Sequence, residues 1–332
     1  QPVSLPAGVM RFHMTRQTLT PITSNNAASL FALEGDLRLV EFHSKANALT
    51  DESMEIVAAA AKDHGKGIII HNDAQHFSAG VDLNAFRTLI EAQDWTGIDD
   101  FLKRFQDAVF KLKYTPVPVV GAPSGLAAGG GYEVLTHCDK LVVHTNSVMG
   151  LVEAAVGVVP GGGGVKDTYF RWHAAKGNWD DAAWQTWMNL GYAATGSSPQ
   201  LSARMQYFRD GHDKTVMNRD RLLPRAIALV GELQDGYAAP AKPVATLASP
   251  DLHAKMDSFM QDGVSRGDFM PHDRTVAMEI AGIVLRGDGD GETASEHDLY
   301  ARERRAFINL CQTPETHARM VSMLDDGAAI RN

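Results

Sequence analysis

The chain is short of several features that would each indicate a particular class of protein. It has only two cysteines, Cys138 and Cys311, and neither belongs to a Cys-x-x-Cys or His-spaced set. This argues against a disulfide framework or a structural zinc site and favours a reducing compartment. No apolar run approaches the ~18 residues that span a bilayer. The first residues also lack a charged-then-apolar secretory signal, so we predict a cytoplasmic protein with no membrane span.

Positive charge is also scarce. The 31 Lys and Arg residues are outnumbered by 40 Asp and Glu residues, which gives a formal charge of −9. Because nucleic-acid binding needs a concentrated positive face, we expect no nucleic-acid partner. The 332 residues allow one large domain or a core with a helical extension. The chain begins with Gln1 instead of Met, which suggests excision from a longer polypeptide, although simple trimming would look the same.

Helices alternate with short apolar strands over much of the first half of the chain. Residues 1–27 are polar and irregular, which predicts a lead-in or linker. The expected strands are 28–33, 37–42, 67–71, 117–121 and 140–144, and the expected helices are 50–61, 97–113 and 129–138. This alternation predicts an α/β fold with a largely parallel sheet and helices packed outside it.

After Gly164 the pattern becomes helical. Three prolines at 240, 243 and 250 indicate a linker, and residues 251–285 and 295–325 are predicted to be helical. The second of these stretches should begin at Ser295, with Asp298 as its capping partner, and break near Pro314. We therefore divide the chain into a lead-in over 1–27, a core over 28–198 and a helical C-terminal region over 199–332.

Two glutamates lie 20 positions apart beside the most glycine-dense stretches of the chain. Glu133 follows three glycines at 129–131, and Glu153 precedes Pro160 and four glycines at 161–164. Glycine leaves backbone N–H groups unshielded, so they can approach a ligand oxygen. If a helix begins near Gly130, its unpaired N–H groups and its dipole suit a thioester or enolate oxyanion. A tight strand-to-helix turn would produce the same run, and that alternative stays open.

The surroundings of the two glutamates favour a chemical role. Glu133 lies one helical turn after the glycine run, and Glu153 precedes apolar residues that would raise its pKa by disfavouring the charged form. Two carboxylates in different environments can divide general-acid and general-base work. The alternative is that each is a solvated or salt-bridged surface residue, as most glutamates are. Upstream, the small residues at 78–80 form a second turn that could supply another N–H donor.

Other motifs do not support a nucleotide or a metal. The glycines at 161–164 lack the Lys-Ser/Thr pair of a phosphate-binding loop, and no Gly-x-Gly-x-x-Gly follows an early strand. The histidines at 71, 76, 137 and 144 have no metal-ligand spacing. We therefore expect no cofactor.

Four segments, in their order and spacing, resemble the motifs of the crotonase family, also called the enoyl-CoA hydratase/isomerase family. They are Ser44 to Leu49, Phe77 to Asp82, Gly129 to Glu133 and Glu153 to Gly161. The resemblance covers about residues 28–172. It implies a crotonase-like ββα superhelix core with a helical C-terminal extension, and an acyl-CoA substrate in which coenzyme A is the carrier.

The resemblance also implies roles for single residues. The N–H groups of Ala79 and Gly130 would form an oxyanion hole, with Glu133 and Glu153 as the two catalytic carboxylates. The Gly161 amide would hold the catalytic water, and Lys45 and Ala46 would form a wall of the CoA site. The remaining substrate-binding residues would be Phe77, Ser78, Gly80 and Asp82. The activity implied is hydration of a trans-2-enoyl-CoA to a 3-hydroxyacyl-CoA in fatty-acid β-oxidation.

The C-terminal segments 217–223, 303–311 and 313–320 resemble long 3-hydroxyacyl-CoA dehydrogenases, whose dinucleotide-binding N-terminal half is absent from this sequence. No dehydrogenase activity is therefore expected of this chain, although that half would accompany it in a longer parent. A trimer-like homo-oligomer is a further expectation. Two alternatives to hydration remain: a Δ3-Δ2-enoyl-CoA isomerase, which needs one carboxylate, and a non-catalytic acyl-CoA-binding or assembly domain.

Overall fold

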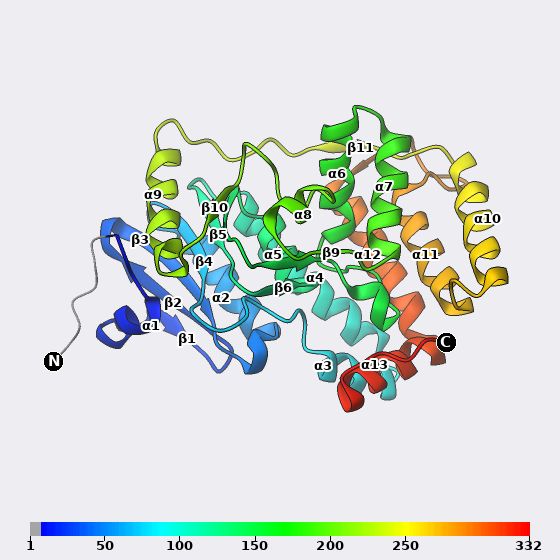
Figure 1. Ribbon diagram of the computed structural model, residues 1–332, viewed down its shortest axis with the longest axis horizontal. Helices are drawn as coiled ribbons and strands as arrows, with labels where there is room; N and C mark the ends of the chain where they lie inside the picture. The colour runs from blue at the N-terminus through cyan, green and yellow to red at the C-terminus, as the bar shows by residue number, and fades with distance from the viewer. Residues whose placement is uncertain (1–7) are drawn as a thin grey trace. The chain divides into compact units, whose positions relative to one another are not determined.

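The computed structural model describes residues 8–332 (Figure 1). The chain divides into two compact units, each assembled from separate stretches of sequence. The first unit comprises Gln1–Val81, Asp107–Gly150 and Gly196–Pro240, and the second comprises Asp82–Gln106, Leu151–Thr195 and Ala241–Asn332. The last boundary, between residues 240 and 241, falls at the start of the predicted proline-marked linker. The expected continuous core over 28–198 is thus distributed between two units.

The first unit contains the main sheet. The strands of this unit are β1 (Thr23–Ser24), β2 (Ala28–Leu33), β3 (Leu37–Phe42), β4 (Ile68–His71), β5 (Val119–Ala122), β6 (Leu126–Ala128), β7 (Lys140–His144), β8 (Val148–Gly150) and β10 (Lys214–Val216). Of these, β6 and β8 pair with each other in parallel outside the main sheet. Its helices are α1 (Phe12–Thr15), η1 (Arg16–Thr18), η2 (Glu34–Asp36), η3 (Lys45–Asn47), α2 (Asp51–Lys62), α5 (Gly130–Thr136), α8 (Pro199–Ala203), η5 (Arg219–Arg221) and α9 (Leu222–Gln234).

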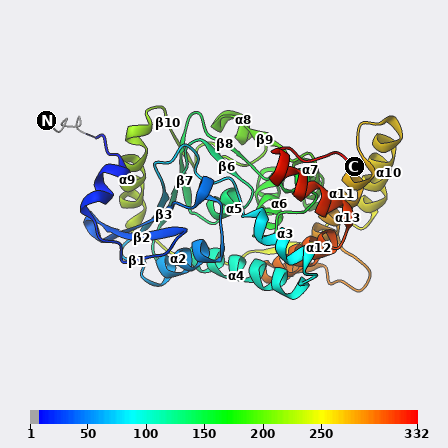
Figure 2. The same ribbon diagram turned by 90° about the horizontal axis from the view of Figure 1, so that it is seen from below.

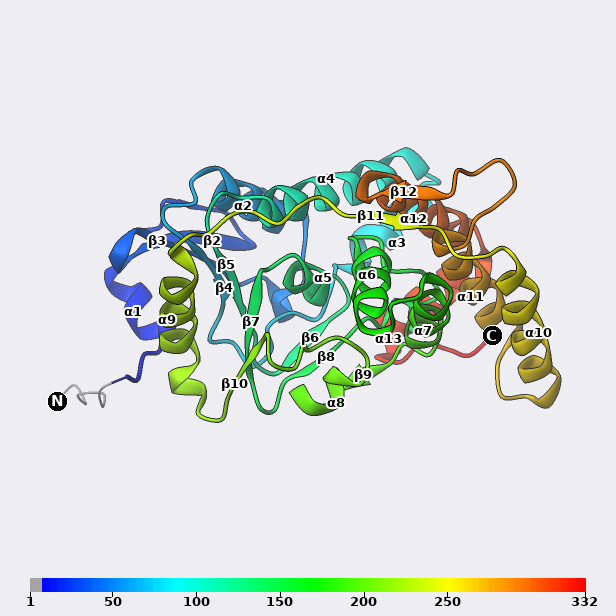
Figure 3. The same ribbon diagram turned by 90° about the horizontal axis from the view of Figure 1, so that it is seen from above.

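The main sheet has the order β1-β2-β3-β4-β5-β7-β10. The first three strands pair antiparallel, whereas β3, β4, β5, β7 and β10 pair in parallel. Alternate residues of a strand point to one face, and Leu39, Ile69 and Val120 are neighbours in register on the face that packs against α9 (Figure 3). The predicted parallel-rich α/β fold is confirmed, with β2, β3 and β7 at the expected bounds.

Two segments of this unit differ from the sequence prediction. Phe12 in α1 is fully buried and packs edge-on against Phe31 with ring centroids 5.1 Å apart, so the described part of the lead-in contributes to the core. Residues 1–7 lie outside the described residues. In the C-terminal region expected to be helical, β10 instead pairs in parallel with β7 and extends the sheet.

The second unit is mostly helical. Its elements are α3 (Leu83–Glu91), most of α4 (Trp95–Lys113), η4 (Glu153–Val156), α6 (Gly164–Lys176), α7 (Trp179–Gly191), α10 (Asp251–Arg266), α11 (Pro271–Val284), α12 (Glu296–Cys311) and α13 (Pro314–Asp326). Strands β11 (Val244–Thr246) and β12 (Thr293–Ser295) pair antiparallel, and β9 (Thr195–Gly196) lies at the boundary between the units. Helices α6 and α7 run side by side (Figure 1), and α13 packs against α3 (Figure 2).

The helix ends of the second unit follow from local sequence. The Ser295 hydroxyl accepts a hydrogen bond from the Asp298 N–H and Asp298 binds the Ser295 N–H, which confirms the predicted capping pair at the start of α12. Pro314 begins α13. The helix predicted over 251–285 is two helices, because Gly267 ends α10 with φ +78° and Pro271 begins α11. Between residues 8 and 332, no helix combines the length and the apolar character needed to cross a membrane.

Candidate active site

The two segments expected to form the oxyanion hole lie next to each other in the first unit. The Ser78 N–H donates to the Leu126 carbonyl at 3.0 Å, and the Ala128 N–H donates to the Ser78 carbonyl at 3.1 Å. A Cβ at Gly131 would lie 2.5 Å from the Ser78 Cβ, and one at Gly80 would lie 3.2 Å from the Ala128 carbonyl oxygen and 3.7 Å from the Gly130 nitrogen. The two backbones therefore approach this closely only because both positions are glycine.

Gly130 presents a free backbone donor. It is the first residue of α5, where a helix has no internal acceptor for its N–H groups. Within residues 8–332 its N–H meets no hydrogen-bond acceptor. The amide that the sequence singled out at this turn is therefore available to bind a ligand oxygen.

The structure differs from the sequence expectation at Ala79. The Ala79 N–H donates to the Ala46 carbonyl at 3.2 Å, and the Gly80 N–H donates to the Ser78 hydroxyl oxygen at 3.1 Å. Val81 is the next residue, and its N–H meets no acceptor in the described part of the chain. Val81, which the sequence reasoning missed, is therefore an available donor directly after the two occupied amides of Ala79 and Gly80. A serine hydroxyl often accepts a hydrogen bond from the backbone N–H two residues further along the chain. Ser78 was therefore a signal that the Gly80 N–H would already have an acceptor.

Glu133 lies in α5, one turn after Gly130, and its side chain is buried at 3% exposure. Its neighbour Tyr132 points into the interior of the unit. The Tyr132 hydroxyl donates to the Tyr207 carbonyl at 2.8 Å, and the two rings meet edge-on at 4.9 Å. The Tyr132 side chain is thus accommodated in the core of the first unit.

Glu153 lies in the second unit as the first residue of η4. Helix α13 holds the turn that follows it. Arg319 donates to the Ala154 carbonyl at 3.3 Å, and the Thr316 hydroxyl donates to the Gly157 carbonyl at 2.6 Å. The backbone carbonyls of Ala154 and Gly157, in the turn that follows Glu153, are therefore fixed by side chains more than 150 residues further along the chain.

Helix α11 supports the same turn through a histidine. The His272 Nε2 atom lies 2.9 Å from the Thr316 hydroxyl oxygen, which already donates its own proton to Gly157. His272 must therefore donate from Nε2. Burial, followed by the positive charge of Arg319, lowers the pKa of His272. The neutral tautomer with its proton on Nε2 satisfies this contact.

The turn that carries Gly161 is anchored within the second unit by polar side chains. Gln106 donates to the Gly161 carbonyl at 2.7 Å, and the Glu303 carboxylate accepts from the N–H groups of Gly163 and Lys166 at 2.7 and 2.8 Å. The Gly161 N–H itself meets no acceptor among residues 8–332. Its expected role in holding the catalytic water stays a prediction.

A buried ion cluster follows the Gly161 turn. The Lys166 ammonium lies 2.6 Å from Asp167 and 2.9 Å from Glu296, with all three side chains at most 6% exposed. Burial alone would lower the pKa of Lys166, but the negative charge of Asp167, with Tyr300 and Glu296, raises it well above its usual value. The Lys166 ammonium therefore pairs with two buried carboxylates at the start of α6.

The remaining predicted residues fall into two groups. Lys45 and Ala46 belong to η3, where Ala46 lines a pocket of about 560 Å³ in the first unit together with Ser44, Asn47 and His76. Buried Phe77 instead packs edge-on against Phe42 at 6.0 Å, and Asp82 caps α3 by accepting from the Asn84 N–H at 3.0 Å. Phe77 thus contributes to the packing of the first unit, and Asp82 fixes the start of α3.

The comparisons with known proteins agree with the fold and with the motifs. The family model described as "Enoyl-CoA hydratase/isomerase" matches residues 37–172. A relative named "Probable 3-hydroxyacyl-CoA dehydrogenase" from Bacillus subtilis is 30% identical over 97% of this chain, and the chain spans 42% of that relative's length. A second relative, "Probable enoyl-CoA hydratase" from the same organism, is 30% identical over 42% of this chain and 55% of its own length.

Solved structures show the same fold. An enoyl-CoA hydratase from Bacillus halodurans superposes with a TM-score of 0.61 at 16% identity, covering 89% of this chain and 99% of its own. An enoyl-CoA hydratase/isomerase from Mycobacterium paratuberculosis gives a TM-score of 0.60 at 14% identity, covering 90% of this chain and 98% of its own. Residues 37–172 thus match the enoyl-CoA hydratase/isomerase family model, and the chain has the crotonase fold.

Proposed function

We propose that this chain is an enoyl-CoA hydratase that adds water across the double bond of a trans-2-enoyl-CoA to give a 3-hydroxyacyl-CoA. The observation that carries the proposal is the pairing of an acceptor-free amide at Gly130 with a buried carboxylate, Glu133, one helical turn later. Amides aimed at a developing oxyanion stabilise the enolate-like intermediate that hydration of a thioester passes through.

In the proposed reaction the thioester carbonyl oxygen accepts hydrogen bonds from the N–H groups of Gly130 and Val81. Polarisation of that carbonyl makes the β-carbon electrophilic. A water held with the help of the Gly161 amide loses a proton to one glutamate and bonds through its oxygen to the β-carbon. The α-carbon then takes a proton from a carboxyl group. Glu133 and Glu153 share these two transfers as base and acid, and no cofactor is needed.

The coenzyme A moiety is proposed to lie along the Lys45–Asn47 turn in the first unit. This turn is fixed to the oxyanion segment, because the Asn47 side chain donates to the His76 carbonyl at 2.8 Å and the Leu49 N–H donates to the Gly80 carbonyl at 2.8 Å. A phosphate-bearing carrier would meet the ammonium of Lys45, which is exposed to solvent. We assign no direct role in substrate binding to Phe77 or Asp82.

We further propose that this activity serves fatty-acid β-oxidation, a role supported by relatives that are named as proteins of fatty acid oxidation complexes. Since the chain spans less than half of the 3-hydroxyacyl-CoA dehydrogenase relative, we propose that a dinucleotide-binding half accompanies it in a longer parent protein. The proposed working location is the cytoplasm. We also propose a trimer-like homo-oligomer. The molecular mass of the protein in solution tests this part of the proposal.

To test the proposal, the purified chain is incubated with crotonyl-CoA and, in a separate reaction, with a 3-enoyl-CoA. Hydration of crotonyl-CoA to 3-hydroxybutyryl-CoA supports the proposal. Migration of the double bond in the 3-enoyl-CoA without hydration would show the isomerase instead, because that reaction needs only one carboxylate to move a proton. Saturable binding of crotonyl-CoA with neither reaction would show a non-catalytic acyl-CoA-binding domain.

A further inference from the structure

Gly161 lies in a narrow slot between two helices that are far apart in the sequence. A Cβ added at Gly161 would lie 2.8 Å from Cδ2 of Leu102 in α4 and 3.2 Å from Cδ2 of Phe307 in α12. Both of these side chains are buried. Because packed interiors leave little spare room, any side chain at this position would displace Leu102. The place of Gly161 in the second unit is therefore set by α4 and α12.

The carbonyl of Gly161 is fixed by Gln106, and the neighbours of Gln106 determine which way its amide points. The Gln106 Nε2 atom donates to the carbonyls of Gly161 at 2.7 Å and Tyr300 at 3.1 Å. On the other side, the Arg304 guanidinium donates to Gln106 Oε1 at 2.6 Å. A guanidinium can only donate and a carbonyl can only accept, so the reversed amide would satisfy none of these contacts. Arg304 is itself held by Asp99, which accepts from its Nε atom at 2.8 Å.

The other end of the turn is fixed by Glu303, the neighbour of Arg304 on α12. Its carboxylate accepts from the N–H groups of Gly163 and Lys166, and its side chain is fully buried. Gly163 is the N-cap residue of α6 and has φ +107°, a conformation that favours glycine. Glycine has no side chain to bind the first N–H groups of the helix, and Glu303 supplies that acceptor from α12 instead.

We infer that Gln106, oriented by Arg304, and Glu303 are positioning residues for the Gly161 amide that holds the attacking water. The inference rests on the proposed function for this use of the amide. With the Gly161 carbonyl and the Gly163 N–H both bound, the backbone between them has little freedom to rotate. The Gly161 N–H, which meets no acceptor among residues 8–332, then keeps one direction before the water arrives.

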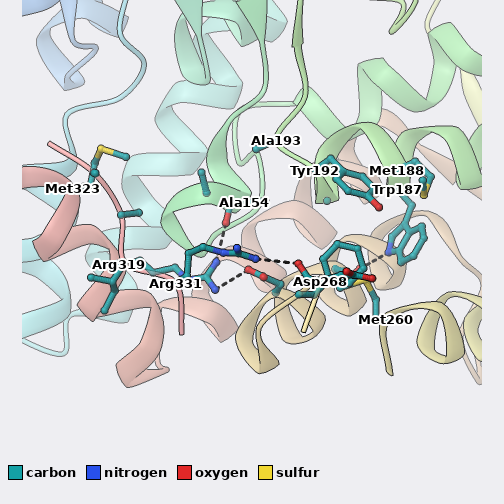
Figure 4. Close-up of a pocket in the computed structure, with 18 of the residues that line it drawn as sticks. Ala154, Trp187, Met188, Tyr192, Ala193, Met260, Asp268, Arg319, Met323 and Arg331 are labelled. Carbon is teal, nitrogen blue, oxygen red and sulfur yellow. Dashed lines mark hydrogen bonds and ion pairs between the residues drawn. The ribbon is translucent and has the colours of Figure 1, made fainter. Parts of the chain in front are cut away.

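The C-terminal helices thus support both of the turns that the proposed reaction uses in the second unit. Figure 4 shows Arg319 of α13 reaching the Ala154 carbonyl directly after Glu153. Glu303 and Arg304 of α12 hold the Gly161 turn in the same indirect way. The C-terminal region therefore sets the geometry of the reaction as well as the stability of the unit.

Kinetics of variants of the full 332-residue chain test the inference. Gln106→Glu keeps the shape of the side chain and can still pair with Arg304, but it places a carboxylate oxygen opposite two backbone carbonyls and repels them. A misplacement of ~1 Å can cost ~10²-fold in rate, so kcat for hydration of crotonyl-CoA should fall by roughly that factor. KM should change less than about threefold, because the thioester is held in the first unit. Gln106→Met, which removes the donor without adding a charge, should give the same split between kcat and KM.

Arg304 offers a rescue experiment. Arg304→Ala removes the donor that orients Gln106, and we expect kcat to fall about tenfold. Arg304→Lys returns a cation that can donate to Gln106 Oε1, and it should recover part of that loss. Equal kcat values for these two variants would show that Arg304 does not orient Gln106.

Tyr169→Phe is the matched control. Tyr169 is buried on α6 in the same unit, and its hydroxyl donates to the Thr246 carbonyl at 2.8 Å, so the variant loses one hydrogen bond without changing the Gly161 turn. It should lower the midpoint of urea unfolding and keep the wild-type kcat. A kcat that falls as far in Tyr169→Phe as in Gln106→Glu, or that stays at the wild-type value in both, would overturn the inference.

Amide hydrogen exchange follows the turn itself and needs no turnover. In Glu303→Gln one of the two N–H groups bound by the carboxylate loses its acceptor, so a peptide spanning residues 161–166 should lose protection, as it should in Gln106→Glu. Tyr169→Phe should leave this peptide as in the wild type. Unchanged exchange in both Glu303→Gln and Gln106→Glu would overturn the inference. A wild-type chain that does not hydrate crotonyl-CoA, but whose 161–166 peptide responds as expected, would keep the anchored turn and refute only the proposed reaction.

Discussion

The guanidinium of Arg319 donates a hydrogen bond to the backbone carbonyl of Ala154 at 3.3 Å, immediately after Glu153. The same side chain is 3% exposed and pairs with Asp273 on α11. A residue of the C-terminal helix therefore holds the backbone beside a candidate catalytic carboxylate. The proposed chemistry depends on a helix that lies 160 residues away in sequence.

Replacement of either glutamate should remove turnover while leaving binding largely intact. Glu133→Gln and Glu153→Gln keep the shape of the side chain but cannot take a proton as a carboxylate does. General acid–base groups contribute ~10²–10⁴-fold, so kcat on crotonyl-CoA should fall by that range with a much smaller change in the dissociation constant of crotonyl-CoA. Turnover near the wild-type rate in either variant would remove that glutamate from the mechanism.

Arg319→Ala should lower both stability and kcat. Removal of one partner of a buried ion pair costs ~3–5 kcal/mol; Asp273 is partly exposed, so we expect about 2–3 kcal/mol in the free energy of unfolding. Arg319→Lys should restore part of kcat, because a cation again reaches the Ala154 carbonyl. Denaturant unfolding and steady-state kinetics measure the two effects.

The matched control for Arg319 is Arg266, whose ion pair with Asp268 is exposed at 60% and 56%. Exposed ion pairs contribute ~0–1 kcal/mol to the free energy of unfolding, so Arg266→Ala should change both stability and kcat little. If the two arginine variants behaved alike, or if kcat survived the loss of Arg319 undiminished, Arg319 would have no positioning role.

The Lys166 cluster predicts a large loss of stability. Lys166→Met leaves Asp167 and Glu296 buried without their cation, and we expect about 3 kcal/mol or more to be lost from the free energy of unfolding. Lys255→Met, at an exposed position on α10, is the control and should lie within about 0.5 kcal/mol of the wild type.

The pH dependence of the Lys166 contribution follows from its raised pKa. A cation whose folded pKa exceeds its unfolded value contributes its full stability below the unfolded value of 10.5, and the contribution is lost only as pH rises through the folded pKa. The difference between wild type and Lys166→Met should therefore stay constant from about pH 6 to pH 9. A stability difference between the two proteins that falls steadily across this pH range would contradict a raised pKa for Lys166.

His272 should make stability rise with pH. Its pKa in the folded chain is lowered from 6.5 by burial and then by Arg319, so the unfolded chain binds the proton more readily. The stability associated with neutral His272 is fully present above pH 6.5 and is lost as pH falls toward the folded pKa. His272→Gln should flatten this slope, whereas His253→Gln at an exposed site of α10 should not. Free energies of unfolding measured at several pH values below 7 provide the test.

Local patterns in the sequence predicted the regular elements well. The short apolar runs at 28–33, 37–42 and 140–144 became strands with those bounds, and the Ser295–Asp298 cap began α12 where expected. The apolar residues Leu299, Phe307, Leu310 and Met320 are all buried, as an amphipathic helical unit requires. These features depend on neighbours a few residues apart.

Local sequence patterns could not predict contacts between residues that lie far apart in the chain. The bond from Ala79 to the Ala46 carbonyl joins segments 33 residues apart, and it depends on Ala46 having φ +55°, which an alanine rarely adopts. The division of the fold into two interleaved units likewise depends on tertiary packing. The sequence therefore indicated a segment that lies beside Gly130, but it could not show that the Ala79 N–H has an acceptor while the Val81 N–H meets none among residues 8–332.

The most direct test of the proposed hydratase is the fate of crotonyl-CoA in ¹⁸O-labelled water, followed by mass spectrometry. The wild-type chain should give 3-hydroxybutyryl-CoA with one ¹⁸O atom on the β-carbon, and Glu133→Gln and Glu153→Gln should bind crotonyl-CoA but form the labelled product at a rate lower by ~10²-fold or more. Recovery of unchanged, unlabelled crotonyl-CoA from the folded wild-type chain would contradict the proposed function.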